Sequence, residues 1–366
     1  MPFLLLYAAA LLLLPSRTVA RNPLRHDGNA TLDGWADPHV KAYTINGTTR
    51  FFCYSTHDYS TADSGFRNEN WRVFESDDLL SWRLVSTLLP NATPAAPSSY
   101  GTCWATDGAT DGVGSYFFYL SLGSEEVGVM RGSTPAGPWE SPLRAPLINA
   151  SLGAALHTEA RDPCVFHDEA ESAHFLVFGT FKYYIARLGA DLISLAEEPR
   201  LLVVLNATSQ NGVGILDDKA YMHRAPGSGA YILSYGAFYA LGASPYGPFR
   251  HVGTWIDKAR IAPAFRTNVT NPPGNCWCQD EDYNDRHGSF FTANGQDFWS
   301  SNDRSHSADR LNTNAFRDSI LTYVHYRANG EIEPVVIDEV GVGEYDAAGA
   351  TSIQAENFFS LRGGGV

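Results

Sequence analysis

The chain has 366 residues, of which 44% are hydrophobic and 18% are charged, and its formal net charge is -14. A surplus of acidic groups repels phosphates, which argues against nucleic acids and anionic membranes as partners. Aromatic residues make up 13% of the chain, alongside 33 glycines and 20 prolines. Turn-forming and aromatic residues at this density, with few charges, favour an all-β fold around a large core.

The N-terminus has the features of an export signal. An apolar run, FLLLYAAALLLLP, is followed by small residues up to Ala20, which predicts a signal peptide over residues 1–20. No Lys or Arg precedes the run, so an uncleaved anchor is the alternative, although the run is shorter than the ~20 residues that a membrane span needs. We therefore expect a secreted protein.

Sequons and cysteines are consistent with export. Six Asn-x-Ser/Thr sequons predict a glycoprotein. They begin at Asn29, Asn46, Asn91, Asn149, Asn206 and Asn268. Among the five cysteines, Cys276 and Cys278 are spaced too tightly for a Cys-x-x-Cys metal site. In an oxidising compartment we expect one or two disulfides and one remaining thiol, with the pairing left open.

Four segments along the chain share apolar alternation, a short polar turn and a closing aromatic or apolar residue. They close at Trp82, Trp139, Leu195 and Phe249 and so recur every 54 to 57 residues. Two of the turns, TPAGPW and SPYGPF, are nearly the same, with proline and glycine setting the backbone. A period of this length indicates a repeated supersecondary unit.

A second series of polar residues lies out of phase with the first. It consists of Asp37, Asp107, Asp162, Asp217 and His287, separated by 70, 55, 55 and 70 residues. Each precedes a strand-like run, which a turn joins to another strand. Five copies of a multi-strand unit, without a long helical period, predict a five-bladed β-propeller over residues 21–345. A β-sandwich or jelly roll is the alternative, but neither gives a beat of ~55 residues.

A propeller would gather three of these carboxylates. The inner strands of the blades surround a central channel, so the residues that begin them meet at one end of it. We expect Asp37, Asp162 and Asp217 to share a pocket there, where mutual repulsion raises some of their pKa values. A general acid and a general base about 6.5–9.5 Å apart hydrolyse a glycosidic bond with inversion, and a third carboxylate tunes the acid.

At these positions the chain resembles a known enzyme family. The segments DGWADPHV, ARDPCVFHDEAESAHFLVFG, DDKAYMHR and RHGSFF are similar, in order and spacing, to the inner-strand signatures of family 43 glycoside hydrolases. The resemblance covers roughly residues 24–338. It implies a five-bladed propeller that hydrolyses arabinose-, xylose- or galactose-containing glycans with inversion.

The resemblance also implies roles for three residues. Asp37 matches the general base that activates water, and Asp162 matches the carboxylate that tunes and orients the acid. His287 matches a histidine near the axis that faces a metal ion or a water cluster. No cofactor is required by this pattern, and a structural calcium ion near the axis is compatible with it.

The general acid departs from the family pattern. Where relatives carry Glu-Gly-Pro, this chain has Asp217, Asp218 and Lys219. One reading makes Asp217 the acid, although it is one methylene shorter than Glu. Another makes His223 the acid, as in the related family 117 enzymes. In the third the acid is lost, and a sugar-binding propeller without turnover, of the lectin class, is the alternative function. Transfer to phosphate ranks last, because the sequence offers only Arg161, Lys219 and Arg224 as basic residues at the mouth.

Further residues are candidates for contact with a carbohydrate, which is the expected partner. Trp35 and Trp104 are candidates for an aromatic floor under a sugar ring, Asp218 is a candidate for binding the sugar, and Arg317 resembles an arginine that reaches the axis from the last blade. The final residues, 346–366, do not follow the blade pattern. Their IQAENF motif resembles the first strand of a carbohydrate-binding module, and a closing strand of the fifth blade is the alternative.

Overall fold

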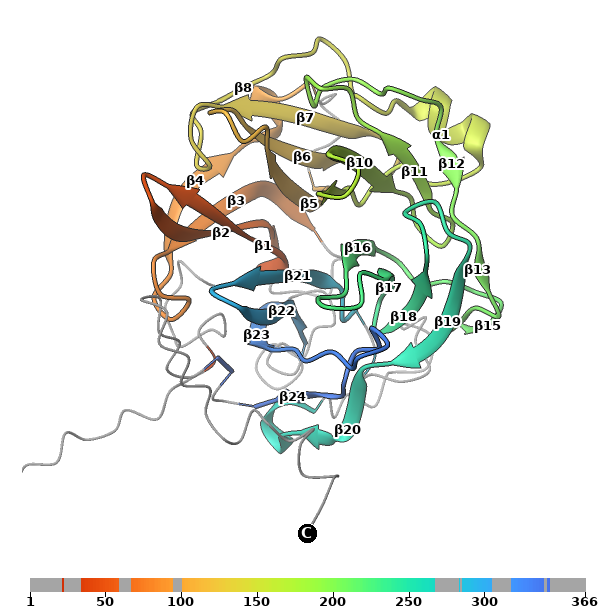
Figure 1. Cartoon of the computed structure of the whole chain (residues 1–366). Coiled ribbons are helices and arrows are strands. Elements are labelled where there is room, and N and C mark those ends of the chain that lie inside the picture. The colour runs from red at the N-terminus through yellow and green to blue at the C-terminus, as the bar shows by residue number, and fades with distance from the viewer. Residues whose placement is uncertain are drawn as a thin grey trace, which may run out of the picture.

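The computed structural model describes Asn22, Tyr283 and residues 34–58, 67–94, 101–266, 285–304, 317–338 and 341–342. Its sheets are arranged in a ring around a common axis, which makes a five-bladed β-propeller (Figure 1). The predicted fold is therefore confirmed. The predicted signal peptide and the tail 346–366 lie outside the described residues. Among the described helices, none has the length and apolar character to cross a membrane.

The first three blades are four-stranded antiparallel meanders. The first consists of β1 (Trp35–Ile45), β2 (Thr48–Asp58), β3 (Asn68–Ser76) and β4 (Arg83–Leu88). The second consists of β5 (Cys103–Thr110), β6 (Tyr116–Leu122), β7 (Val127–Gly132) and β8 (Trp139–Glu140). The third consists of β9 (Cys164–Asp168), β10 (Ala173–Phe178), β11 (Tyr184–Arg187) and β12 (Arg200–Leu201).

The last two blades depart slightly from this pattern. The fourth consists of β16 (Ala220–Arg224), β17 (Tyr231–Tyr235), β18 (Phe238–Gly242) and β19 (Phe249–Thr254), with β13 (Val204–Leu205) parallel to β19. The fifth consists of β21 (Gly288–Ala293), β22 (Gln296–Asp303) and β23 (Asp318–Tyr323). The strands β1, β5, β9, β16 and β21 contact one another in turn around the axis.

Short elements connect the blades. They are η1 (Pro90–Ala92), α1 (Ala150–Leu156), η3 (Pro263–Phe265) and the hairpin of β14 (Thr208–Ser209) and β15 (Gly212–Val213). A parallel pair, β20 (Ile256–Ile261) and β24 (Val335–Ile337), joins the segment after the fourth blade to the segment after the fifth. This pairing ties the end of the described chain into the ring.

The predicted repeats correspond to real turns. Trp139 and Phe249 each begin the outer strand of a blade, after a turn in which a Thr or Ser hydroxyl accepts a hydrogen bond from a backbone N–H two residues later. Both turns contain a cis Gly-Pro bond. Trp82 directly precedes β4, whereas Leu195 only forms an isolated bridge with Leu188 and begins no strand. The sequence repeat of ~55 residues thus marks the boundaries between blades, as a radial repeat requires.

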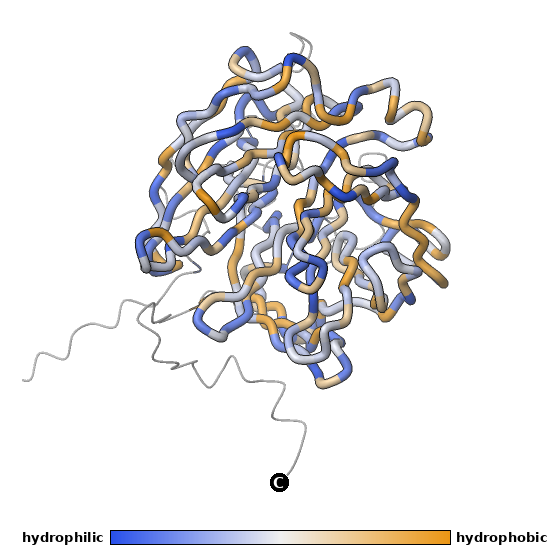
Figure 2. The backbone as a smooth tube through the Cα atoms, turned by 45° about the horizontal axis from the view of Figure 1, so that its top comes forward, coloured by the Kyte–Doolittle hydropathy of each residue, from blue (hydrophilic) through white to orange (hydrophobic). Residues whose placement is uncertain are grey.

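The core is distributed between the blades, since each sheet buries both faces against its neighbours. Hydrophobic stretches are accordingly found all around the ring and not in one layer (Figure 2). Cys53, Cys103 and Cys164 are part of this core and form no disulfide, while Cys276 and Cys278 lie outside the described residues. The remaining expectation of disulfides concerns only those two.

One contact between blades requires a glycine. The buried ring of Tyr54 on β2 lies over Gly108 on β5, and a Cβ added at Gly108 would stand 2.1 Å from a ring carbon. The Tyr54 hydroxyl donates to the Pro135 carbonyl (3.0 Å), which prevents the ring from moving away. The first two blades therefore approach closely only because Gly108 has no side chain.

We predict that Gly108→Ala lowers the free energy of unfolding by about 1–3 kcal/mol, because the added methyl overpacks this contact. Urea denaturation measures the effect. In a Tyr54→Ala background the same substitution should cost much less, since the two positions are coupled. An equal cost in both backgrounds would contradict the packing described here.

Candidate active site

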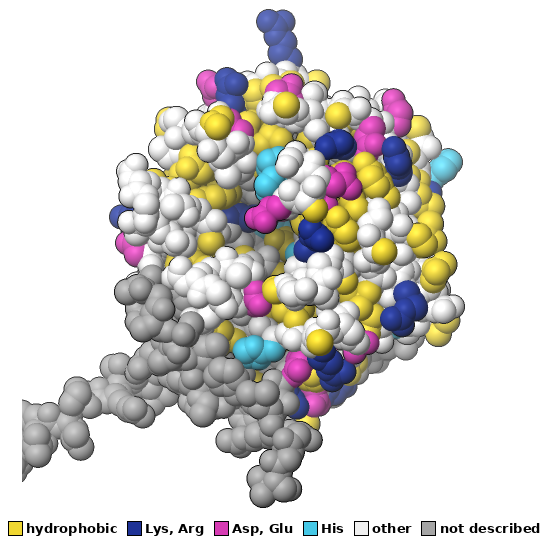
Figure 3. All heavy atoms as spheres, in the orientation of Figure 1, with side chains coloured by type: hydrophobic (Ala, Val, Ile, Leu, Met, Phe, Trp, Pro, Cys, Tyr) yellow, Lys and Arg dark blue, Asp and Glu magenta, His cyan; other side chains and the backbone are white. Residues whose placement is uncertain are grey.

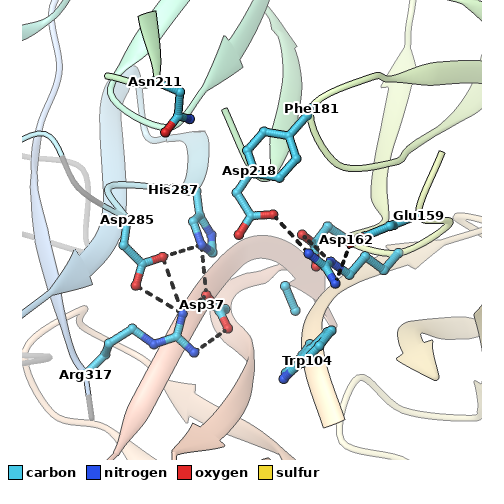
Figure 4. Close-up of a pocket in the computed structure, with 12 residues that line it drawn as sticks. Asp37, Trp104, Glu159, Asp162, Phe181, Asn211, Asp218, Asp285, His287 and Arg317 are labelled. Carbon is cyan, nitrogen blue, oxygen red and sulfur yellow. Dashed lines mark hydrogen bonds and ion pairs between the residues drawn. The ribbon is translucent and has the colours of Figure 1, made fainter. Parts of the chain in front are cut away.

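A cavity of about 690 Å³ lies where the inner strands begin, and every blade contributes to its wall (Figure 4). It is lined by Asp37, Trp104, Ala105, Glu159, Arg161, Asp162, Phe181, Asn211, Asp218, Asp285, His287 and Arg317. The predicted gathering of distant polar residues at one end of the axis is thus seen in the structure for Asp37, Asp162 and His287. We call this cavity the axial pocket.

Asp37 is aimed into the axial pocket by its backbone. It has a left-handed φ of 51° and lies at an irregularity in the β1–β2 pairing between Ala36 and His39. Asp tolerates this conformation better than most residues, and such strain is concentrated at functional sites. Its backbone N–H donates to the Asn302 side chain (2.7 Å), whose amide donates back to the Asp37 carboxylate (3.0 Å).

A buried arginine compensates the charge of Asp37. The Arg317 guanidinium donates to both Asp37 oxygens, at 2.9 and 3.1 Å. It is held in turn by Asp58 at 2.8 and 2.9 Å, and Asp58 is completely buried. Burial raises the pKa of Asp58, which the charge of Arg317 opposes. The expectation that Arg317 reaches the axis from the last blade is met by this placement.

His287 is the second cation beside Asp37. Its Nε2 lies 3.3 Å from an Asp37 oxygen and 2.7 Å from an oxygen of Asp285, which also pairs with Arg317 (3.3 Å). Burial opposes the charged imidazole, but the two carboxylates outweigh it and raise the pKa of His287 to about 9. His287 is therefore an imidazolium at neutral pH. Its Nδ1 is buried without a partner in the described part of the chain.

The expectation of a cation beside His287 can be tested on these residues. Asp37, Asp285 and His287 present ligand atoms within 4.8 Å of one another. However, the space between the two carboxylates is already served by the Arg317 guanidinium and the protonated His287 Nε2. A metal ligand must be an unprotonated imidazole nitrogen, whereas the Nε2 that faces these carboxylates carries the proton that it donates to Asp285. These residues do not fit a calcium ion.

Deeper in the channel, cationic side chains fill the axis. The Lys41 Nζ lies 2.9 Å from Asp107, and the buried Lys219 Nζ donates to the carbonyls of Thr106 (3.1 Å) and Pro163 (3.2 Å). Asp107 also receives the Val165 N–H (2.7 Å). Asp107 is the fifth residue of β5, which is why it lies in this axial cluster and not in the pocket. The cluster lies beyond the axial pocket along the inner strands, and none of these three side chains lines the pocket.

The opposite wall of the pocket carries a different charge arrangement. Arg161 pairs with Glu159 (2.8 Å), approaches Asp162 (3.8 Å) and Asp218 (3.7 Å), and stacks on the ring of Trp104 at 4.5 Å. Asp162, like Asp37, has a left-handed φ, and its backbone N–H donates to Ser121 (2.9 Å). Trp104 is thus on the pocket wall, as expected from the sequence.

Asp218 is a carboxyl group on this wall whose proton affinity is raised. Its side chain is 41% exposed, and it lines the pocket. Enclosure in the pocket and the nearby charge of Asp162 raise the pKa of Asp218 to about 7, against the effect of Arg161. Figure 4 shows the Asp218 and Asp37 carboxyl groups facing the same space, with no interaction drawn between them.

Asp217 does not line the axial pocket, although the sequence places it in phase with Asp37 and Asp162. Its side chain points the other way and accepts hydrogen bonds from Gln210 (3.2 Å), Asn211 (3.2 Å) and the Asp218 N–H (2.8 Å). Burial raises its pKa. Consecutive side chains of an extended segment point to opposite sides, so a one-residue difference exchanges a pocket residue for a buried one.

Two other sequence candidates lie away from the pocket. Trp35 is completely buried and stacks on Phe74 at 3.9 Å, so it is a core residue and not an aromatic floor. His223 lines a different cavity, where it bonds Tyr326 (2.9 Å), and burial lowers its pKa to about 3. Neither residue lines the space that Asp37 faces.

Several pocket residues had no role in the sequence interpretation. Asp285 lies two residues before His287, and this spacing puts both side chains on one side of an extended segment. The spacing could have identified Asp285 as a pocket residue. Of the three basic residues expected at the mouth, Arg161 lines the pocket, whereas Lys219 belongs to the axial cluster and Arg224 lines a different cavity. Phe181 and Asn211 come from loops outside the repeat series, so no periodic signal could mark them.

The fold is a β-propeller, and the pocket gathers carboxyl groups at one end of its axis. The sequence profile of "Glycosyl hydrolases family 43" matches residues 43–332. The chain therefore belongs to family 43 of the glycosyl hydrolases and is a glycosidase.

Named relatives agree with this membership. The chain is similar to the β-D-galactofuranosidase xynD of Aspergillus niger, with 28% identity over 331 residues and 86% of each chain covered. It is 24% identical over 269 residues to a xylosidase/arabinosidase of Bacteroides ovatus, which covers 60% of this chain and 78% of the relative.

Solved structures show the same fold. One is a β-xylosidase/α-arabinofuranosidase from a compost microbial metagenome, in complex with xylotriose and in calcium-free form. It has a TM-score of 0.63 and 22% identity, and the match covers 87% of this chain and 97% of that one. An arabinoxylan arabinofuranohydrolase from Bacillus subtilis has a TM-score of 0.68 and 20% identity, covering 90% of this chain and 72% of that one.

We predict that chelation leaves this protein unchanged. Because Arg317 and His287 already neutralise the acidic cluster, dialysis against EDTA should alter neither the melting temperature nor glycosidase activity. Added calcium should not raise the melting temperature, as it would if the ion bound the folded state. A melting temperature that falls with EDTA and recovers with calcium would contradict this account of the site.

Proposed function

We propose that the protein is a secreted, inverting glycosidase that removes terminal sugars from galactofuranose-, arabinose- or xylose-containing glycans. A galactofuranoside is the leading substrate, because the relative that matches over 86% of both chains is named for that activity. Removal of a terminal sugar is supported by the relatives' names, galactofuranosidase and xylosidase/arabinosidase, which denote the release of single sugar residues.

One observation carries the proposal. Asp37 and Asp218 face the same space from opposite walls, and their surroundings differ in charge. Asp37 contacts two cations, Arg317 and His287. Asp218 instead lies near a second carboxyl group, Asp162, and has a pKa raised to about 7. Pairs of titratable groups set apart in this way assign a base and an acid.

In the proposed reaction, the Asp37 carboxylate accepts a proton from a water that attacks the anomeric carbon. Asp218 donates its proton to the leaving oxygen, so the glycosidic bond breaks as the new bond to water forms on the opposite face. The charge of Asp162 favours the protonated form of Asp218, and the Arg161 guanidinium, 3.7 Å away, holds the Asp218 side chain in position. Trp104 and Phe181 offer apolar surfaces for the sugar ring. Asp218 thus takes the role that the sequence assigned to Asp217 or His223.

Export and glycosylation remain part of the proposal. The four sequon asparagines in the described regions, Asn46, Asn91, Asn149 and Asn206, are all exposed. Exposure is a requirement for a mature glycan at these positions, and it supports a secreted glycoprotein.

Substitution of the two carboxyl groups tests the proposed roles. With 4-nitrophenyl β-D-galactofuranoside, α-L-arabinofuranoside and β-D-xyloside as substrates, Asp37→Asn and Asp218→Asn should each lower kcat by about 10²–10⁴-fold, the usual contribution of general acid–base catalysis. Asp218→Asn should lose far less with a dinitrophenyl leaving group, which needs no protonation. The matched control, Asp217→Asn, should stay within about tenfold of the parent because its side chain is outside the pocket.

The first sugar released should have the anomeric configuration opposite to that of the substrate, which NMR detects before mutarotation. Retention of configuration would refute the assignment. So would a loss of kcat of about 10²-fold or more in Asp217→Asn. Sugar binding without hydrolysis of any of the three substrates would favour the lectin-like alternative.

The pH profile should report Asp218. Its protonated form is the active one, so kcat/KM should fall as the pH rises through about 7. Arg161→Met removes a charge that lowers the pKa of Asp218, and this basic limb should move to higher pH. Asp162→Asn removes a charge that raises it, and the limb should move to lower pH. Shifts of the two variants in the same direction would contradict the role of these neighbours.

A further inference from the structure

A second cavity, of about 580 Å³, is lined by residues from the far ends of the inner strands. Its lining includes the polar side chains of Lys41, Glu169, His223, Arg224 and Tyr326. Figure 3 shows a hollow near the middle of one face of the propeller, with acidic, basic and histidine side chains around it. Nothing in the proposed reaction uses this second cavity.

The two cavities lie at opposite ends of the axis. Strand β1 runs from Asp37 in the axial pocket to Lys41 in the second cavity, and β16 starts just after Asp218 and ends at Arg224. Four to six residues of extended chain span about 13–20 Å. The axial cluster around Asp107 separates the two cavities, so the second cavity is not an exit for products of the first.

The charges in the second cavity are largely compensated. Lys41 is paired with the buried Asp107, and Arg224 lies 3.5 Å from Asp168 and donates to the Gly229 carbonyl at 3.1 and 3.2 Å. Glu169 is exposed at the rim. A cavity without surplus positive charge does not select a phosphate or another anion. Its ligand is expected to be uncharged.

The uncharged groups of the cavity are arranged for hydrogen bonding beside aromatic surfaces. The His223 ring lies parallel to Phe290 at 4.3 Å, and its Nε2 bonds the Tyr326 hydroxyl. Its Nδ1 is buried and has no partner among the described residues. A buried polar atom without a partner is costly, so a group that pairs with it from the cavity stabilises the site.

We propose that the second cavity is a separate binding site for a neutral mono- or disaccharide. Sugars present donors and acceptors together with apolar ring faces, and they require mixed polar partners beside aromatic side chains. Glu169 offers acceptors, Arg224 offers donors, and His223 and Tyr326 offer both. Only the choice of sugars for the test rests on the proposed function.

The test is an NMR titration of the full mature chain with D-galactose, L-arabinose and D-xylose, following backbone amide shifts. At least one sugar should shift amides around the β16–β17 turn, as a set distinct from any near Asp37. The variant Glu169→Gln/Tyr326→Phe should weaken binding in the second cavity about tenfold, as the loss of two hydrogen bonds implies. The matched control Glu171→Gln, exposed but outside the cavity, should bind like the parent.

The aryl-glycoside assay separates this proposal from the proposed function. Glu169→Gln/Tyr326→Phe and Glu171→Gln should both hydrolyse substrate at the parent rate. Binding in the second cavity by a chain that hydrolyses nothing would support the second site while overturning the glycosidase mechanism. The second site is overturned if none of the three sugars shifts amides there up to 100 mM (about the weakest useful sugar affinity), or if the double variant binds as well as the parent.

Discussion

The guanidinium of Arg317 is the ion on which the axial pocket depends. It is nearly buried, and it bonds three carboxylates, Asp37, Asp58 and Asp285, which come from the first and the fifth blades. Removing one partner from such a buried network costs about 3–5 kcal/mol, because the remaining charges lose their compensation. The same contact therefore joins the last blade to the first and fixes the Asp37 carboxylate in the axial pocket.

The chemistry follows from an unequal division of charge across the pocket. One wall has two cations for Asp37, while the other has one arginine shared among Glu159, Asp162 and Asp218. In the second environment, enclosure and the nearby charge of Asp162 raise the pKa of Asp218 to about 7. Two aspartates with the same intrinsic chemistry can thus act as base and acid in one reaction. Further along the axis, Lys41 and Lys219 of the axial cluster add positive charge that belongs to the chain itself.

Much of the fold could be predicted from the sequence because the propeller repeats itself. The spacing of Asp37, Asp107, Asp162, Asp217 and His287 marked the five inner strands, and each residue except Asp107, which lies within β5, is at or near the start of one. The exact face was harder to predict. Asp107 enters the axial cluster because β5 begins earlier relative to it, and the pocket takes Asp218 in place of Asp217. Periodicity locates a strand, but only its three-dimensional start decides which side chain faces inward.

The remaining surprises concern contacts between segments that no pattern connects. Trp35 looked like a sugar platform because it lies two residues before Asp37. The irregular pairing between Ala36 and His39 and the left-handed φ of Asp37 break the alternation of the strand, and Trp35 packs against Phe74 in the core. Asp58 and Asn302 hold Arg317 and Asp37 from positions about 20 and 265 residues away from Asp37. Such partners are chosen by the tertiary fold, and a single sequence contains no local signal for them.

The central claim is that Asp218 carries a proton near neutral pH while it faces Asp37 across the pocket. The most direct measurement is an NMR titration of ¹³C-labelled aspartate carboxyl groups in the substrate-free protein, with Asp218→Asn used to assign the signal. The account predicts a carboxyl resonance that titrates near pH 7 and is absent from that variant. A resonance of Asp218 that titrates near the ordinary aspartate value of about 4 would contradict it.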